Sequence, residues 1–179
     1  NKKKDSVSFA EAKAKGIKME EPQSLYMTSR PHRRPSVLYN SMVAPLIPYT
    51  IKGAIWYQAE SNRNRYKDYA DLLKSMVAGW RNDFGVGEFP FYYVQIAPYS
   101  YGNSAAPLSG FMRDEQLKAM ALIPNSGMVC TLDLGNEFWI HPAEKETVAK
   151  RLAGWSLSET YGVKGLQYKS PTYKSFEVK

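Results

Sequence analysis

The chain has 179 residues, of which 44% are hydrophobic and 13% aromatic, and this excludes an intrinsically disordered chain, which is poor in both. One cysteine, Cys130, excludes an intrachain disulfide and a cysteine-built zinc site, and only two histidines, His32 and His141, argue against a histidine-rich metal site. We therefore predict no metal site. No apolar run reaches the roughly 18 residues that a membrane span needs, so we predict no membrane contact either. The net charge is +7.

Most of the positive charge lies at the start of the chain. Residues 1–34 hold nine Lys or Arg against four Asp or Glu, and the remaining residues hold fifteen against thirteen. A basic stretch can bind nucleic acid, but this one is spaced by Glu, Ala and Gly and accompanies no nucleic-acid motif. We therefore expect a basic arm or linker over 1–34, with a short helix over 5–16, and no nucleic-acid partner. Residues 1–5 precede no apolar segment and do not resemble a signal peptide.

A regular pattern begins after Pro35. Three short apolar runs predict buried strands over 52–58, 89–97 and 127–132. Between and after them, apolar residues at helical spacing predict helices over 66–83, 111–123 and 143–161. This alternation is typical of parallel βαβ units, so we predict an α/β fold: a three-layer α/β/α sandwich with a parallel sheet. The domain is expected over 35–165, followed by a C-terminal tail over 166–179.

Polar residues follow the first predicted strand. Gln58, Ala59, Glu60, Ser61 and Asn62 stand where ligands bind in open α/β sheets, beyond the carboxyl ends of the strands. They are compatible with an Asx-rich turn that caps the next helix. They are equally compatible with a pocket for an anion or oxyanion, lined by the amide of Gln58 or Asn62 and by backbone N–H groups.

A second polar segment follows the third predicted strand. It contains Asp133 and Glu137 and ends at His141, just ahead of a predicted helix. A histidine at this position can be a cap or a surface residue. It is also well placed for a general base, since it lies near carboxylates beyond a strand end.

Four ordered segments together resemble a known family. Residues 51–62, which include the run Trp-Tyr-Gln-Ala-Glu-Ser-Asn, closely resemble the W-Y-Q-G-E-S-N block of the sialate O-acetylesterases, carbohydrate esterases of the SGNH-hydrolase superfamily. Residues 35–46 look like the family's P-x-x-L-Y-N-G-M segment, and residues 69–81 look like its helix ending in W-R. Residues 133–152 look like its terminal D-(I/L)-G…I-H-P block, so the resemblance covers roughly 35–162.

The resemblance implies an SGNH or flavodoxin-like fold without a metal or organic cofactor, which hydrolyses acetyl esters on sugars by acyl transfer. Carried over by position, His141 would be the general base. Gln58, the N–H of Ala59, and Asn62 would surround the oxyanion, and Glu60 would be a structural or orienting carboxylate. The resemblance also suggests a secreted or periplasmic location.

Several positions depart from the family pattern. The family's G-Q-S-N-M block, which holds the nucleophilic serine, has no counterpart here. The segment around Ser24 resembles it only weakly. Ala59 and Ser41 replace glycines, and Trp139 replaces the aspartate common two residues before the histidine. Nearby Glu137 or Asp133 would then be candidates to orient the imidazole instead.

The missing serine block leads to two hypotheses. In a strand order of 2-1-3-4-5 the three predicted strands correspond to the half 3-4-5, which leaves an open edge beside residues 53–57. We expect this chain to be the C-terminal part of a longer polypeptide, or to pair with another chain, and to be inactive alone. The alternative is a non-catalytic glycan-binding protein, favoured by the departures above and by tyrosines near a strand end: Tyr92, Tyr93, Tyr99 and Tyr101.

Overall fold

The computed structural model describes residues 34–102 and 107–178. It divides into two units, one ending at Pro48 and one beginning at Tyr49. The first unit contains a π-helical turn, η2 (Tyr39–Val43), followed by a 3₁₀ turn, η3 (Ala44–Leu46). The predicted helix over 5–16 and the candidate Ser24 lie outside the described residues, and the predicted domain boundaries stay predictions.

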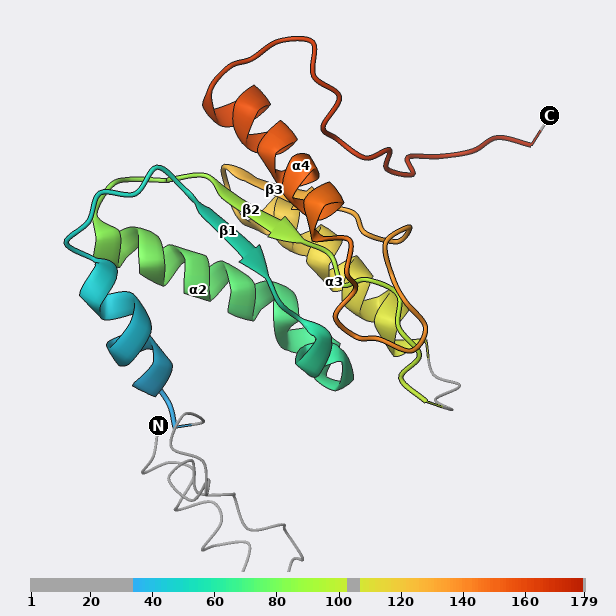
Figure 1. Cartoon of the computed structure of the whole chain (residues 1–179), viewed down its shortest axis with the longest axis horizontal. Helices are drawn as coiled ribbons and strands as arrows, with labels where there is room; N and C mark the ends of the chain where they lie inside the picture. Colours follow the sequence, from blue (N-terminus) through green and yellow to red (C-terminus); the bar gives the residue numbers. More distant parts are fainter. Residues whose placement is uncertain (1–33, 103–106, 179) are drawn as a thin grey trace, which may run out of the picture. The chain divides into compact units, whose positions relative to one another are not determined.

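The second unit contains a parallel sheet of three strands (Figure 1). The strands are β1 (Ala54–Tyr57), β2 (Phe91–Val94) and β3 (Ser126–Val129), in the order β1-β2-β3. In this register Tyr57 lies opposite Val94, which lies opposite Val129. The predicted parallel sheet is confirmed. Each strand is shorter than its apolar run because the regular pairing covers only four residues of each.

Helical segments follow each strand. A 3₁₀ segment, η4 (Glu60–Asp68), leads into α2 (Tyr69–Phe84), and α3 (Leu108–Leu122) follows β2. After β3 comes α4 (Lys145–Trp155), which ends in a π-helical turn, η5 (Ser156–Thr160). The predicted helices are therefore present. The first becomes α-helical only at Tyr69, because the polar residues before it form the tighter 3₁₀ turns.

Helices cover both faces of the sheet, and β2 separates two hydrophobic clusters (Figure 1). On one face Phe91 and Tyr93 pack with residues of α2 and α3, and on the other Tyr92 and Val94 pack with residues of α4. Successive side chains of a strand point to opposite faces, so a strand buried on both sides is apolar throughout, as β2 is. The predicted three-layer α/β/α arrangement is confirmed.

Close packing between the layers explains one glycine of β3. A Cβ atom added at Gly127 would lie 2.3 Å from the Trp155 ring of α4. No side chain fits at that distance, so the strand needs glycine where the helix crosses it.

A buried glutamine completes the pairing of β2 beyond the end of β1. Gln116 of α3 accepts a hydrogen bond from Ile96 N–H (2.9 Å) and donates one to Val94 O (3.2 Å). Pro90 O accepts from Ala54 N–H, so the even-numbered residues of this stretch face β1. β1 ends at Tyr57, opposite Val94, and Gln116 therefore binds backbone groups that β1 does not reach.

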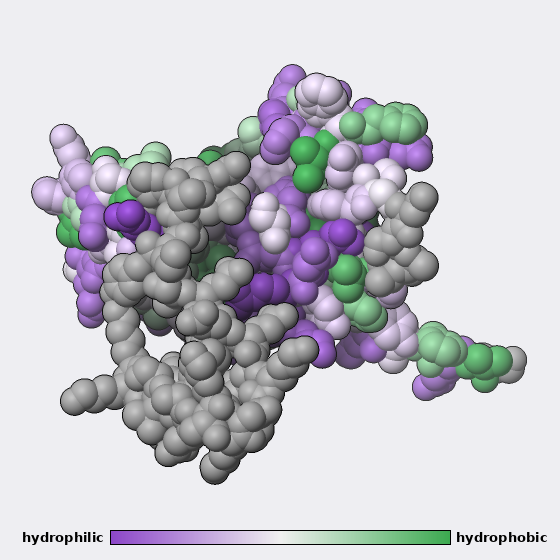
Figure 2. Space-filling view, turned by 90° about the horizontal axis from the view of Figure 1, so that it is seen from below, coloured by the Kyte–Doolittle hydropathy of each residue, from purple (hydrophilic) through white to green (hydrophobic). Residues whose placement is uncertain are grey.

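The C-terminal tail packs against α4 before it extends away. The Tyr168 ring lies edge-on to Trp155, with centroids 5.1 Å apart, and the Tyr168 hydroxyl donates to Glu159. Figure 2 shows the tail as a projecting segment with hydrophobic residues, and its exposed apolar side chains include Phe176 and Val178. Within residues 34–102 and 107–178, no helix combines the length and the apolar character that crossing a membrane requires.

Candidate functional site

Three segments meet beyond the carboxyl ends of the strands. The Lys145 ammonium lies 4.6 Å from the centroid of the Tyr57 ring, which joins the start of α4 to the end of β1. The Arg63 guanidinium lies 4.1 Å from the centroid of the Tyr101 ring, which joins η4 to the loop after β2. The N–H of Ser100 donates to Glu137 O (3.0 Å) and links that loop to the segment after β3.

The loops after β2 and β3 are held together tightly. The N–H of Asn136 donates to Pro98 O (3.1 Å), and a Cβ atom at Gly135 would lie 2.4 Å from the same oxygen. Glycine at position 135 allows this close backbone approach. The segment that leads to His141 is therefore fixed to the end of the central strand.

The structure brings Gln58 and Asn62 together. Gln58 Nε2 donates to Asn62 Oδ1 (2.6 Å), and Asn62 N–H donates to Ala59 O (2.8 Å). The Tyr69 hydroxyl donates to Gln58 O (3.1 Å) and anchors the turn on α2. Because the Asn62 side-chain oxygen accepts this bond, the NH₂ group of the Asn62 amide points away from Gln58.

The backbone N–H of Ala59 is bound to the neighbouring carboxylate. Ala59 N–H donates to Glu60 Oε2 (3.1 Å). Ala59 is fully buried and has φ 156° and ψ −12°, a conformation that residues other than glycine rarely adopt. In this structure, Glu60 thus engages the N–H group that the family resemblance assigns to the oxyanion.

The negative charge of Glu60 acts on three tyrosines. Burial, and then the negative charge of Glu60, raise the pKa of Tyr57 and of Tyr101, and burial raises the pKa of Tyr69 to about 12. The hydroxyls of Tyr57 and Tyr101 are buried and have no hydrogen-bond partner in the part of the chain that the structure describes. Both therefore keep their protons at neutral pH, and each hydroxyl retains the capacity to donate a hydrogen bond.

His141 is exposed and lies four residues before Lys145, the first residue of α4. Four residues of extended chain span at most roughly 14 Å, so His141 is held within that reach of the residue that packs on Tyr57. The exposed rings of Phe138 and Trp139 precede it. No carboxylate among the described residues forms an ion pair with the imidazole.

The two candidate orienting acids have different partners. Both Asp133 oxygens bind Arg151 (2.8 and 2.6 Å), and this pairing lowers the pKa of Asp133 to about 2. Asp133 is therefore engaged by Arg151 in this structure. Glu137 is exposed, and its described contact is made by its backbone carbonyl.

Two arginines near the carboxyl ends of the strands were not predicted from the sequence as site residues. Arg63 directly follows the Gln58–Asn62 turn, and Arg113 lies on α3, where its Nε donates to Ile96 O (3.1 Å). The signal for Arg113 was its spacing of three residues from Gln116, which puts two polar residues on the buried face of an otherwise apolar helix stripe. Within the described ranges, no three His, Cys, Asp or Glu side chains lie close enough to hold a metal ion.

The chain is similar to a known family of proteins. A family described as "Carbohydrate esterase, sialic acid-specific acetylesterase" matches residues 23–158. The sialate O-acetylesterase of Rattus norvegicus is 36% identical over 160 residues, which are 80% of this chain and 30% of that protein; that of Homo sapiens is 32% identical, covering 80% and 31%. The chain thus spans about 30% of the length of these relatives.

A solved structure is also similar. The crystal structure of a carbohydrate acetylesterase from Xanthomonas citri superposes with a TM-score of 0.72 at 34% identity, over 77% of this chain and 32% of that one. Sequence and backbone therefore agree over most of the chain. It follows that this chain belongs to the family of carbohydrate esterases described as sialic acid-specific acetylesterases.

Proposed function

We propose that this chain forms the histidine-bearing part of a carbohydrate O-acetylesterase. The serine that attacks an acetyl ester on a sugar would come from a polypeptide segment outside these residues. The observation that carries the proposal is the contact of Lys145 with Tyr57, 4.6 Å from ring centroid to ammonium. It puts the segment that follows His141 against the end of β1, directly before Gln58. Family membership supports the acetyl ester as the substrate class.

In the proposed reaction His141 is the general base. It takes the proton of the serine hydroxyl as the serine oxygen bonds to the acetyl carbon, and it returns that proton to the sugar oxygen as the ester C–O bond breaks. Water then releases acetate from the acyl serine by the same route. The amide NH₂ groups of Gln58 and Asn62 would donate to the oxyanion, because their mutual hydrogen bond leaves further N–H groups available.

A strand edge supports the proposed source of the serine. β1 pairs with β2 on one side only, and its backbone on the other side carries no partner strand in the described part of the chain. Unpaired strand edges invite pairing with further chain. We infer that the polypeptide that brings the nucleophile also extends the sheet along β1.

A second candidate function is glycan binding without hydrolysis. The observation that favours it is the hydrogen bond from Ala59 N–H to the Glu60 carboxylate. With this donor occupied, and a negative charge beside it, one donor to the oxyanion is missing. Removing one such donor costs about 10²–10³ in rate. Hydrolysis therefore requires the Glu60 side chain to turn away when substrate binds.

The experiment compares the chain alone with the chain mixed with a family segment that carries the G-Q-S-N-M block. We expect no release of p-nitrophenol from p-nitrophenyl acetate by the chain alone, and turnover by the mixture. His141→Ala should lower that turnover about 10³-fold or more, whereas His32→Ala, the other histidine, should leave it unchanged.

Three results separate the alternatives. Turnover by the chain alone that disappears in Ser24→Ala would put the nucleophile in this chain and contradict the proposal. A mixed complex that forms in gel filtration and binds sugar without hydrolysing it would select the glycan-binding function. Equal turnover in the presence and absence of the His141 imidazole would remove that residue from the mechanism.

A further inference from the structure

The two faces of the sheet are covered unequally. On one face, residues of α2 and α3 pack with residues of all three strands. On the other face, α4 packs against β2 and β3 (Figure 1). A helix is about 10 Å wide and neighbouring strands lie about 4.8 Å apart, so one helix covers about two strands. Within the described residues, β1 is therefore left without a helix of its own on the α4 face.

Ile55 lies on this uncovered face. It stands opposite Tyr92 in the register of the sheet, and Tyr92 belongs to the hydrophobic cluster beneath α4. Paired residues of neighbouring strands point to the same face. Tyr92 is nevertheless 3% exposed, whereas Ile55 is 69% exposed. Ala54 and Trp56, which point to the opposite face, are partly buried against α2 and its neighbours.

One side of α4 and η5 is turned toward β1. Near its start, the Lys145 ammonium lies 4.6 Å from the centroid of the Tyr57 ring. At its end, the hydroxyls of Thr160 and Tyr92 share a hydrogen bond of 2.8 Å. Steps of three or four residues lead along one side of a helix, so the residues between these two contacts can be identified. They are small and uncharged: Ala149, Ala153 and Ser156.

A groove of about 260 Å³ separates the start of β1 from η5. Residues 52–55, Pro90 and Tyr92 line it on the sheet side, and Ser156, Thr160 and Tyr161 line it on the helix side. Among these described residues only Lys52 is charged. Ala149 and Ala153, which continue the helix side, are exposed. We call the surface formed by Ile55, Tyr161 and this side of α4 the β1 groove.

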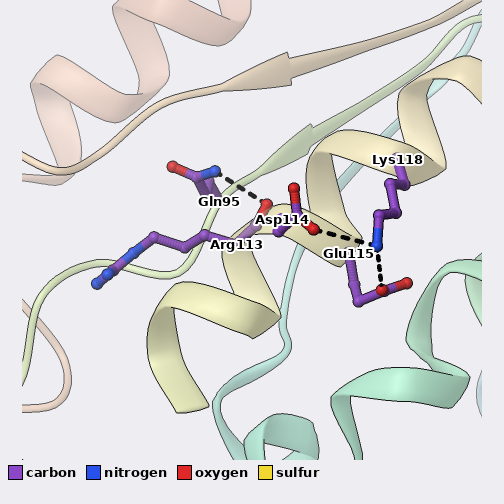
Figure 3. Close-up of polar contacts among 5 residues, drawn as sticks. All are labelled: Gln95, Arg113, Asp114, Glu115 and Lys118. Atoms are coloured by element: carbon purple, nitrogen blue, oxygen red, sulfur yellow. Dashed lines mark hydrogen bonds and ion pairs between the residues drawn. The ribbon is translucent and has the colours of Figure 1, made fainter. Parts of the chain in front are cut away.

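A side of α3 that faces water has a different composition. Figure 3 shows Lys118 reaching both Asp114 and Glu115, with contacts of 3.0 and 2.7 Å. Such pairs of opposite charge are typical of a helix side that stays in water. The side of α4 that faces β1 carries small side chains in their place, and small side chains let a second helix approach closely.

The direction of the chain connections indicates which element fills the groove. Parallel strands are joined by right-handed crossovers, and the crossover from β1 to β2 through α2 lies on the face opposite α4. A right-handed crossover that runs the other way, outward from a parallel strand added at the free edge of β1, therefore places its helix on the α4 face. The relatives contain further polypeptide, since this chain spans about 30% of their length.

We propose that the β1 groove binds one amphipathic α-helix of the polypeptide that supplies the serine. Apolar side chains of that helix cover Ile55, and its backbone lies close to Ala149 and Ala153. The identity of the polypeptide rests on the proposed function. The helix is a second contact with it, in addition to the strand that pairs with the edge of β1.

The test uses two fluorescently labelled polypeptides that contain the family's G-Q-S-N-M block. The longer one continues through the first predicted helix after the block, and the shorter one ends before that helix. Fluorescence anisotropy measures how each binds the chain. We expect the longer polypeptide to bind, and Ala153→Trp, which fills the groove, to weaken that binding roughly tenfold or more. The shorter polypeptide should bind more weakly, and equally to both proteins.

The matched control is Ala121→Trp, the same change at an exposed alanine of α3. Because α3 covers the other face of the sheet, this variant should bind both polypeptides as the unchanged chain does. Ile55→Ala removes the apolar floor without adding volume, and it should also weaken binding of the longer polypeptide. Thermal unfolding of each variant checks that it folds.

The proposal fails if the longer polypeptide does not bind, or if Ala153→Trp and Ala121→Trp bind it equally well. It also fails if Ala153→Trp instead abolishes self-association of the chain in sedimentation velocity, because the occupant is then a second copy. Neither readout involves hydrolysis. Helix-dependent binding without turnover in the mixture would overturn only the proposed function. Turnover in a mixture whose binding is insensitive to Ala153→Trp would overturn only the helix-binding groove.

Discussion

Ala59 has a backbone conformation that glycine adopts without strain and that most other residues rarely adopt. Its φ of 156° and ψ of −12° lie outside the regions where an L-residue avoids steric clashes. Such conformations cost about 1–3 kcal/mol and persist where surrounding contacts impose them. Here the contacts are the hydrogen bonds that both backbone groups of Ala59 make within the turn, to Glu60 and Asn62.

We predict that Ala59→Gly raises the free energy of unfolding by about 1 kcal/mol, because the relief of backbone strain exceeds the added entropy of glycine in the unfolded chain. Urea denaturation measures the change. The matched control is Ala119→Gly, an equally buried alanine inside α3, which should lower the free energy of unfolding by about 1 kcal/mol or more. A loss at position 59 as large as at position 119 would mean that Ala59 is not strained.

At this scale the sequence predicted where polar residues gather better than which atoms they bind. The position of Gln58 and Asn62 directly after a buried strand follows from the alternation of strands and helices, and the structure joins the two amides as neighbours. The partner of Asp133 could not be predicted, because Arg151 lies 18 residues away on a helix whose orientation depends on packing around Trp155. The same applies to Arg113, whose partner Ile96 is 17 residues away.

One arginine connects the segment after β3 to α4. Arg151 of α4 donates to Cys130 O (2.7 Å) and binds both oxygens of Asp133. The loop that leads to His141 is therefore tied at its start to the helix that begins at its end. A bidentate pair of this kind restricts the loop more than a single contact would.

We predict that this connection weakens in acid. The pKa of Asp133 is lowered to about 2 from 3.8, so its contribution to stability is complete above about pH 4 and is lost as the pH falls through about 2. Asp133→Asn should remove that part of the pH dependence, measured as the urea midpoint between pH 5 and pH 2. Glu137→Gln, in the same loop and without an ion pair in the described residues, should keep it. Identical pH profiles for all three proteins would contradict this role of the Asp133–Arg151 pair.

The elements themselves were largely predictable. Apolar runs and helical spacing identified the three strands and the helices that follow them, and β2 is apolar throughout because both its faces are covered. The start of α2 was not predictable from spacing, because Tyr66 continues the apolar pattern while η4 forms tighter turns. Hydrophobic spacing reports burial and does not distinguish the two kinds of helical turn.

For the molecule as a whole, the outer edge of β1 is the feature that remains unfilled in the described residues. Ile55, in the middle of this strand, is 69% exposed, although it stands in an apolar run that is typical of a buried strand. This edge strand is short, but it carries an exposed apolar side chain and no charge or proline, the residues by which proteins oppose edge-to-edge pairing.

We predict that the chain self-associates through this edge when no other polypeptide covers it. Ile55→Lys should shift the population toward monomer in sedimentation velocity experiments at increasing concentration, because a charge on an edge strand opposes pairing. Leu72→Lys, an equally drastic change at an exposed position of α2, should leave the association unchanged. If both variants dissociate the chain to the same extent, association is a general hydrophobic effect and does not involve β1.

The side chain of Gln116 has a consequence for how such a domain can vary. This side chain binds Val94 O and Ile96 N–H, which are the backbone groups that a longer β1 would otherwise bind. The stretch after Tyr57 is therefore not needed to pair with this part of β2. Changes in the length and chemistry of this stretch would therefore leave the hydrogen bonds between Gln116 and β2 intact.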